Sequence, residues 1–115
     1  MASFPKRGDI YIIDYNPETG MDESRPVVVV QNNVGNEYAK TIIFALIEAG
    51  TKPAYDLEIY LPKNESGLES DGIIRLDRLF TLDKNHFIQK SGSAAADTIV
   101  QLDKGLQISL GLTEF

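Results

Sequence analysis

The first half of the chain is dominated by short runs of β-branched and aromatic residues, separated by polar segments rich in Asn, Pro and Gly. Residues 9–15 form the first run and end in a cluster of turn formers at 16–20, a pattern typical of a strand followed by a loop. Residues 27–30 are four consecutive valines, which is typical of a central strand covered on both faces. After a connection over 32–40, residues 41–47 predict a third strand.

The pattern becomes more polar after residue 50. Residues 56–61 alternate polar and apolar side chains, which predicts a half-exposed strand ended by Pro62. Residues 72–76 predict a short fifth strand, and residues 80–89 fit a helical turn or a strand equally well.

The last part of the chain follows a helical period. Apolar residues spaced three and four apart predict a helix that begins near Ala94, with Ser93 as its N-cap. The members of this stripe are Ile99, Leu102, Leu106 and Leu110. The whole pattern therefore predicts a mainly β, α+β fold: a mostly antiparallel β domain with a C-terminal helix.

Length and composition fit a single folded domain. The 115 residues are enough for one hydrophobic core, so we expect one domain over 1–115, and the apolar fraction of 43% argues against disorder. No apolar run approaches the ~20 residues that span a bilayer, and the N-terminus lacks a signal-like apolar stretch, so we expect a cytoplasmic protein without a membrane partner. With no cysteine and one histidine, we expect neither a disulfide nor a typical metal site.

The charge balance restricts the class of partner. The formal net charge of −6 argues against a protein that coats nucleic acid non-specifically. A local basic groove is still compatible with the sequence, because several cations stand in or beside the predicted strands. The alternative interpretation is that these cations belong to an ordinary solvated surface of mixed charge. These cations are Lys6, Arg7, Arg25, Arg75, Arg78 and Lys84.

The second and third predicted strands place one arginine in a defined position. If the two strands are antiparallel and Gln31 pairs with Thr41 or Ile42, every other pair is fixed, because opposed positions sum to a constant. Arg25 then falls opposite Ile47 or Glu48. In the second register a guanidinium and a carboxylate share one face at the end of the sheet, which makes either a phosphate-binding site or an ordinary cross-strand ion pair.

Five segments, in order and at comparable spacing, resemble the MazF/PemK family of toxin endoribonucleases. They are Arg7-Gly8-Asp9-Ile10-Tyr11, a loop with Pro17 and Gly20, Arg25-Pro26 through Gln31-Asn32 with Gly35-Asn36, Thr81-Leu82-Asp83-Lys84, and Leu106 to Leu112. The resemblance runs from near residue 6 to the C-terminus.

The resemblance implies an SH3-like small barrel extended by an additional antiparallel sheet and helices. It also implies a homodimer, metal-independent and cofactor-free cleavage of single-stranded RNA by a sequence-selective mRNA interferase, and neutralisation by a cognate antitoxin. The two long apolar strands and the helical stripe agree with a dimer, although the stripe could equally pack on its own domain.

The family's motifs assign roles to individual residues. The arginine of the Arg-Pro motif matches Arg25, which the resemblance makes catalytic. Glu48 stands where the family has its partner threonine, and the nearest threonine, Thr51, is a further catalytic candidate. The family's RNA-contacting Glu-Gln-Ile-Arg-Thr stretch corresponds to residues 77–81. The expected RNA-binding residues are Arg78, Phe80 and Thr81, with Asp22, Glu23 and Ser24 in the loop before Arg25.

These residue types suit RNA cleavage by the neighbouring 2′-hydroxyl, which is already held close to the phosphorus. A guanidinium matches phosphate with its fork of donors and stays charged at any working pH, so Arg25 would stabilise the phosphoryl oxygens. A carboxylate can accept the hydroxyl proton, so we predict Glu48 as the base.

A second interpretation keeps the fold without the catalysis. The chain could be a non-catalytic binding protein, either a catalytically weakened homologue or a DNA gyrase poison like the CcdB toxins. A gyrase poison of the CcdB type is expected to carry an exposed tryptophan on its C-terminal helix. This chain has no tryptophan, which argues against that alternative.

Overall fold

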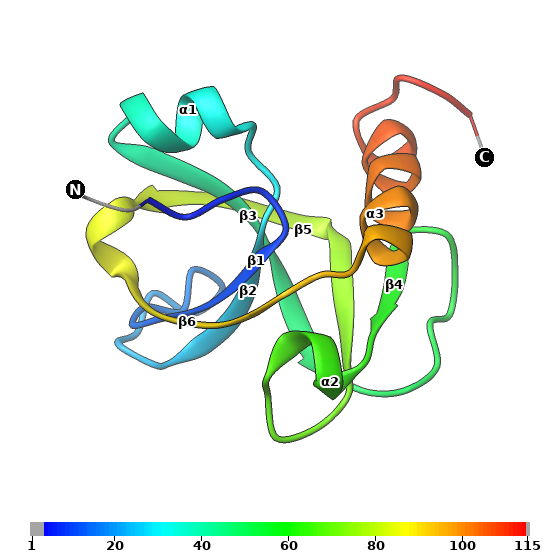
Figure 1. Cartoon of the computed structure of the whole chain (residues 1–115), viewed down its shortest axis with the longest axis horizontal. Helices are drawn as coiled ribbons and strands as arrows, with labels where there is room; N and C mark the ends of the chain where they lie inside the picture. Colours follow the sequence, from blue (N-terminus) through cyan, green and yellow to red (C-terminus); the bar gives the residue numbers. More distant parts are fainter. Residues whose placement is uncertain (1–3, 115) are drawn as a thin grey trace.

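The computed structural model describes residues 4–114, and its strands form one antiparallel sheet in the order β4-β5-β3-β2-β1-β6 (Figure 1). The strands are β1 (Asp9–Ile13), β2 (Arg25–Val29), β3 (Thr41–Ala49), β4 (Glu58–Leu61), β5 (Gly72–Asp83) and β6 (Phe87–Ser93). The helices are α1 (Asn33–Tyr38), α2 (Lys63–Ser66) and α3 (Ala96–Ser109), with a 3₁₀ turn η1 (Lys84–His86). The mainly β, α+β class with a C-terminal helix is confirmed.

The β2–β3 register is one of the two that the sequence predicts. Val27 pairs with Leu46 and Val29 with Phe44, which is the register that brings Gln31 opposite Ile42. The connection between the two strands contains the short helix α1, which the sequence did not reveal. Asn32 caps it, because its side chain accepts a hydrogen bond of 2.9 Å from the Gly35 N–H.

Strand β5 is longer than the predicted 72–76 and changes direction along its length, as its yellow-green ribbon shows in Figure 1. It pairs with β3 from end to end, but Ala45 faces Leu79 whereas Leu46 faces Arg75, so the residues between Arg75 and Leu79 form a bulge. The segment 80–89, left open between helix and strand, is the end of β5, the turn η1 and the beginning of β6.

The sheet does not close into the expected barrel, since β4 and β6 are its two edges. The short helix α2 bridges them instead: it directly follows β4, and the Ser91 hydroxyl of β6 donates to the Ser66 carbonyl at 2.7 Å. The approach is so close that a Cβ on Gly92 would lie 2.2 Å from the Glu65 carbonyl oxygen. The sheet therefore stays open, and a helix rather than strand pairing spans the gap between its two edges.

Helix α3 begins at Ala96 with Ala95 in the cap position, so the prediction of Ser93 as N-cap is wrong. Ser93 ends β6, where its hydroxyl donates to Asp9 Oδ1 at 3.2 Å. Glu65 of α2 takes over the capping role from outside the helix. Its Oε1 accepts hydrogen bonds from the Ala95 N–H at 2.7 Å and from the Thr98 hydroxyl at 2.8 Å.

The apolar side chains lie on both faces of the sheet. One core holds Ile10, Val28, Ala45, Ile47, Ile59, Leu61, Ile74, Leu76 and Leu102, with Ile99 and Leu106 against it, so most of the predicted stripe of α3 packs on its own sheet. The other core holds Ile13, Val27, Phe44 and Leu46, partly covered by four further apolar side chains. Among residues 4–114 no helix is long and apolar enough to cross a membrane.

Candidate active site

Arg25 is the first residue of β2 and pairs with Ile13 of the neighbouring strand β1, so the central strands fix the position of its backbone. Its side chain is 20% exposed and reaches the loop that joins β1 to β2, where Nη1 lies 3.3 Å from Glu18 Oε1. Arg25 is therefore a half-buried cation whose head group is at the sheet end.

A second arginine reaches the same carboxylate. Arg78, from the bulged part of β5, contacts Glu18 Oε2 through its Nη1. The partial desolvation of Glu18 raises the pKa of its carboxyl, but the hydrogen bonds and positive charges of Arg78 and Arg25 outweigh it and hold the pKa below its ordinary value. The geometry gathers two guanidinium groups around one anionic position.

Glu48 shares a sheet face with Arg25, but the predicted contact between them is wrong. The paired part of β2 and β3 ends at Val27 and Leu46, and a continuation of this register would bring Arg25 opposite Glu48. Glu48 Oε2 instead accepts a hydrogen bond of 2.9 Å from Arg75 Nη1. The physical reason is the β5 bulge, which places Arg75 directly across from Leu46, on the neighbouring strand.

Arg75 is the centre of an acidic cluster. Besides Glu48, it contacts Asp77 at 2.9 Å and Glu58 at 3.6 Å, and Tyr55 donates to Asp77 at 2.9 Å. The hydrogen bonds that Arg75 donates to Asp77 and Glu48 raise the pKa of Arg75, whereas burial opposes the shift. Burial raises the pKa of Asp77, but its bonds with Arg75 and Tyr55 outweigh this effect and lower it. Arg75 thus fixes the position of Glu48 rather than competing for an external anion.

The other predicted site residues lie in three places. Thr51 is exposed in the connection between β3 and β4. Phe80 is half-buried and lies over the second core, its ring centroid 6.3 Å from that of Phe44, whereas Thr81 on the opposite face of β5 is exposed. The structure therefore supports a packing role for Phe80, which is half-buried rather than enclosed.

The loop residues Asp22, Glu23 and Ser24 are exposed and directly precede Arg25. Glu23 Oε2 accepts a hydrogen bond of 3.1 Å from the buried Asn16 side chain, so its carboxylate is tied to the loop itself.

Sequence reasoning missed Glu18 and Arg75. Glu18 stands inside the turn-forming cluster at 16–20, and an acid presented by a turn beside Arg25 was a signal that could have identified it. Arg75 was assigned to a strand but not to the site, because the register of β5 on β3 depends on a bulge that no local pattern marks.

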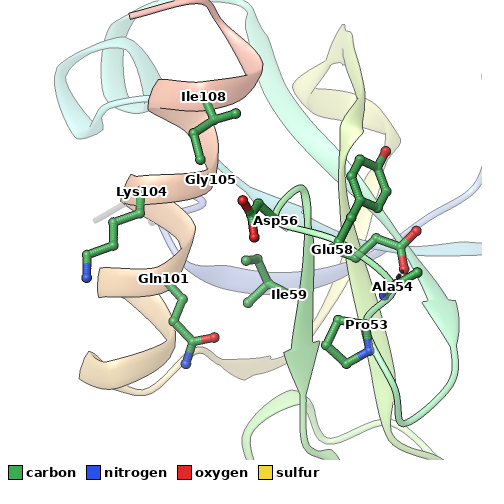
Figure 2. A pocket seen from close by; sticks show the side chains of 10 residues that line it. Pro53, Ala54, Asp56, Glu58, Ile59, Gln101, Lys104, Gly105 and Ile108 are labelled. Carbon is green, nitrogen blue, oxygen red and sulfur yellow. Dashed lines mark hydrogen bonds between the residues drawn. The ribbon is translucent and has the colours of Figure 1, made fainter. Parts of the chain in front are cut away.

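The acidic cluster continues into a hollow of about 460 Å³ between α3 and the segment before β4 (Figure 2). Glu58 links the two, because it contacts Arg75 and also lines this hollow with Pro53, Gln101, Lys104 and Ile108. Arg25, Glu18 and Arg78 do not line it. In residues 4–114 no three His, Asp or Glu side chains are grouped as metal ligands would be.

The fold is shared with solved structures of endoribonucleases and of MazF proteins. An endoribonuclease in complex with its cognate antitoxin, from mycobacterial species, superposes with a TM-score of 0.80 at 20% identity, covering 95% of this chain and 97% of that one. A MazE–MazF complex from Deinococcus radiodurans gives 0.75 at 21% identity, covering 97% and 100%.

The sequence narrows this class to one family. Residues 6–110 match the family described as PemK-like, MazF-like toxin of type II toxin–antitoxin system, and the chain belongs to this family. The endoribonuclease MazF of Staphylococcus epidermidis is 35% identical over 113 residues, covering 96% of this chain and 94% of that protein.

Proposed function

We propose that this chain is a sequence-selective endoribonuclease toxin that cleaves single-stranded RNA without a metal ion. The observation that carries the proposal is the convergence of Arg25 and Arg78 on one anionic position at the end of β2. Two guanidiniums that share an oxyanion can equally hold two oxygens of a phosphodiester. The 35% identity to an endoribonuclease over nearly the whole chain supports the same activity.

The reaction divides between two groups. Glu48 accepts the proton of the 2′-hydroxyl, and the oxygen of that hydroxyl then attacks phosphorus. The bond from phosphorus to the 5′-oxygen breaks, and this oxygen takes a proton from a solvent water molecule to become a 5′-hydroxyl, leaving a 2′,3′-cyclic phosphate; the proton on Glu48 returns to solvent. Arg25 stabilises the charge on the non-bridging oxygens.

The geometry around Glu48 suits a base that is fixed in place. Arg75 occupies Oε2, while Oε1 accepts no hydrogen bond from residues 4–114 and can receive the proton. Thr51, the second catalytic candidate, lies outside the strands in an exposed connection. Glu48 is therefore the better-placed base.

We assign RNA selectivity to residues of β5 and of the loop before Arg25. The edge of the Arg78 guanidinium binds the phosphate, while its flat face and the half-buried Phe80 ring offer planes on which single-stranded bases stack; Thr81, on the opposite face of β5, offers a hydroxyl for edge contacts. Asp22, Glu23 and Ser24 line the approach to Arg25 in the preceding loop.

The partners follow from the family. We place the toxin in the cytoplasm as a homodimer that a cognate antitoxin neutralises. Solved structures of the same fold include an endoribonuclease with its antitoxin and a MazE–MazF complex.

The test is incubation of the purified protein with a long RNA of known sequence in EDTA. We expect discrete fragments with 2′,3′-cyclic phosphate ends, and we expect Arg25→Ala to lose about 10²–10³-fold in rate while it stays folded, as when an oxyanion-stabilising donor is removed. Other termini, or no dependence on Arg25, would contradict the mechanism. Intact RNA would favour a non-catalytic binding protein on this fold.

A further inference from the structure

The loop between β1 and β2 is built around one buried side chain. Asn16 is 4% exposed. The backbone N–H of Asn16 donates to the Met21 carbonyl at 2.9 Å, and the backbone carbonyl of Asn16 accepts from the Gly20 N–H at 2.8 Å. Gly20 closes the turn with a φ of +75°, a left-handed conformation that favours glycine. Because these bonds fix the loop from within, its position does not depend on the arginines.

The same asparagine orients Glu18. Asn16 Oδ1 accepts a hydrogen bond of 3.0 Å from the Glu18 N–H, an Asx turn that sets the direction in which the Glu18 side chain leaves the loop. This side chain is 23% exposed and divides its two oxygens between Arg25 and Arg78. In residues 4–114 Glu18 is the ion-pair partner of both arginines.

The carboxylate has the chemistry of the group that the arginines are proposed to bind. A carboxylate and the non-bridging edge of a phosphodiester both offer two oxygens that share one negative charge, and a guanidinium recognises both with the same fork. An RNA phosphate and Glu18 cannot both lie between Arg25 and Arg78.

We propose that Glu18 is an acidic gate, a residue that occupies the phosphate position of the unliganded toxin and that RNA must displace. The inference rests on the proposed function, because it takes Arg25 and Arg78 as the phosphate site. To reach Arg25, an RNA phosphate must break the ion pairs of Glu18 with Arg25 and Arg78. The free energy for this has to come from contacts that the RNA makes elsewhere, through its bases. Glu18 is thus a specificity-determining residue for RNA capture rather than a participant in bond cleavage.

Charge and position give the gate a kinetic signature. With Glu18 in place, RNA must break two charge-assisted contacts to bind. With Gln in its place, the two guanidiniums keep their full positive charge for the phosphate. Once the phosphate is seated, Glu18 has left the position in both proteins, so the chemical step changes little. A residue that only held the arginines in place would behave in the opposite way, because its loss would lower kcat.

The experiment compares wild type with Glu18→Gln in two assays at fixed ionic strength. The first measures kcat and KM on an RNA that contains a mapped cleavage site. The second measures Kd for a labelled pool of random 2′-O-methyl 12-mers, which bind as RNA does but cannot be cleaved. Glu37→Gln is the control, since it makes the same charge change on the exposed side of α1. Urea unfolding confirms that both variants fold.

We expect Glu18→Gln to lower KM and Kd by about 3–10-fold, the range set by losing two partly exposed ion pairs, with kcat within about twofold. The control should shift Kd by less than about twofold. Unchanged or weaker binding in Glu18→Gln, or a fall in kcat, overturns the gate. If the wild type cuts no RNA, the proposed nuclease function fails, and the oligonucleotide assay still decides whether Glu18 blocks the arginine pair.

Discussion

At the scale of single residues, the candidate site contains two arginine–carboxylate systems that differ in how many acids surround each arginine. Glu18 neutralises the pair Arg25 and Arg78, whereas Arg75 is saturated by acids and holds Glu48 by one oxygen. The first system can exchange its anion, and the second cannot do so without breaking a cluster. Under the proposed function, the first system binds the phosphate and the second accepts the proton.

If Glu48 is the base, Glu48→Gln should lower the cleavage rate by about 10²–10⁴-fold, because an amide cannot accept the hydroxyl proton. The acidic limb of the pH–rate profile should disappear with it. Glu58→Gln is the matched control, since Glu58 also contacts Arg75 but lies on the edge strand β4, and its rate should stay near that of wild type. Cleavage that persists in Glu48→Gln, or rises in Glu48→Thr, would identify Glu48 as an obstacle instead.

The acids that the arginines hold should make the fold sensitive to low pH. The pKa values of Glu18 and Asp77 lie below their ordinary values of 4.5 and 3.8, so the unfolded chain binds protons before the folded one does. Their contribution to stability is complete above the unfolded values and is lost as the pH falls through the folded values. We expect the urea midpoint to drop below about pH 4.5, and to drop less steeply in Asp77→Asn. Equal slopes in both proteins would contradict this.

At the scale of elements, the decisive features are those that break local patterns. The sequence predicted the positions of β1 to β4 to within a few residues, since β1 to β3 are marked by apolar runs and β4 by an alternation of polar and apolar residues. The β5 bulge, the polar edge strand β6 and the helix α2 left no such mark, because tertiary contacts define them. The position of Arg25 could be predicted because it begins β2, whose apolar run is clear in the sequence. The positions of Arg75 and Glu18 could not, because the first depends on the β5 bulge and the second on the conformation of the β1–β2 loop.

The close contact between α2 and β6, called the seam below, leaves no room for a side chain at Gly92. A methyl group on Gly92 would meet backbone atoms, 2.2 Å from the Glu65 carbonyl oxygen and 2.6 Å from the Ser66 carbonyl. We expect Gly92→Ala to lower the free energy of unfolding by about 1–3 kcal/mol, as overpacking does. In Gly50→Ala the new methyl meets only the adaptable Ile73 side chain, at 3.1 Å, so its loss should be smaller. Equal losses in urea unfolding would show that the seam is not tightly packed.

At the scale of the whole molecule, the exposed apolar surface bears on assembly. Most of the α3 stripe is used on the chain's own sheet, so the stripe alone does not require a partner. Large apolar side chains nevertheless lie exposed elsewhere, among them Tyr38 at 80%, Val34 at 72% and Ile88 at 61%. Val34 and Tyr38 are four residues apart on α1 and so share one side of this helix, which makes them a candidate apolar patch for a partner to cover.

We therefore expect sedimentation at micromolar concentration to show a species of twice the 12.7 kDa chain mass. Val34→Asp, on the exposed side of α1, tests whether this helix contributes to the interface, and Glu37→Gln on the same helix is its control. A 12.7 kDa species alone in the wild type would contradict the dimer.

The two neighbours of β1 become available at very different times during synthesis. β2 follows it within a short loop, but β6 pairs Asp9 with Ser93, near the other end of the chain. A pairing between such distant residues closes a long loop before its contacts can compensate the lost entropy, so it forms late. A nascent chain on the ribosome therefore keeps the outer edge of β1 unpaired, and α2 without its contact to Ser91, until β6 has been made.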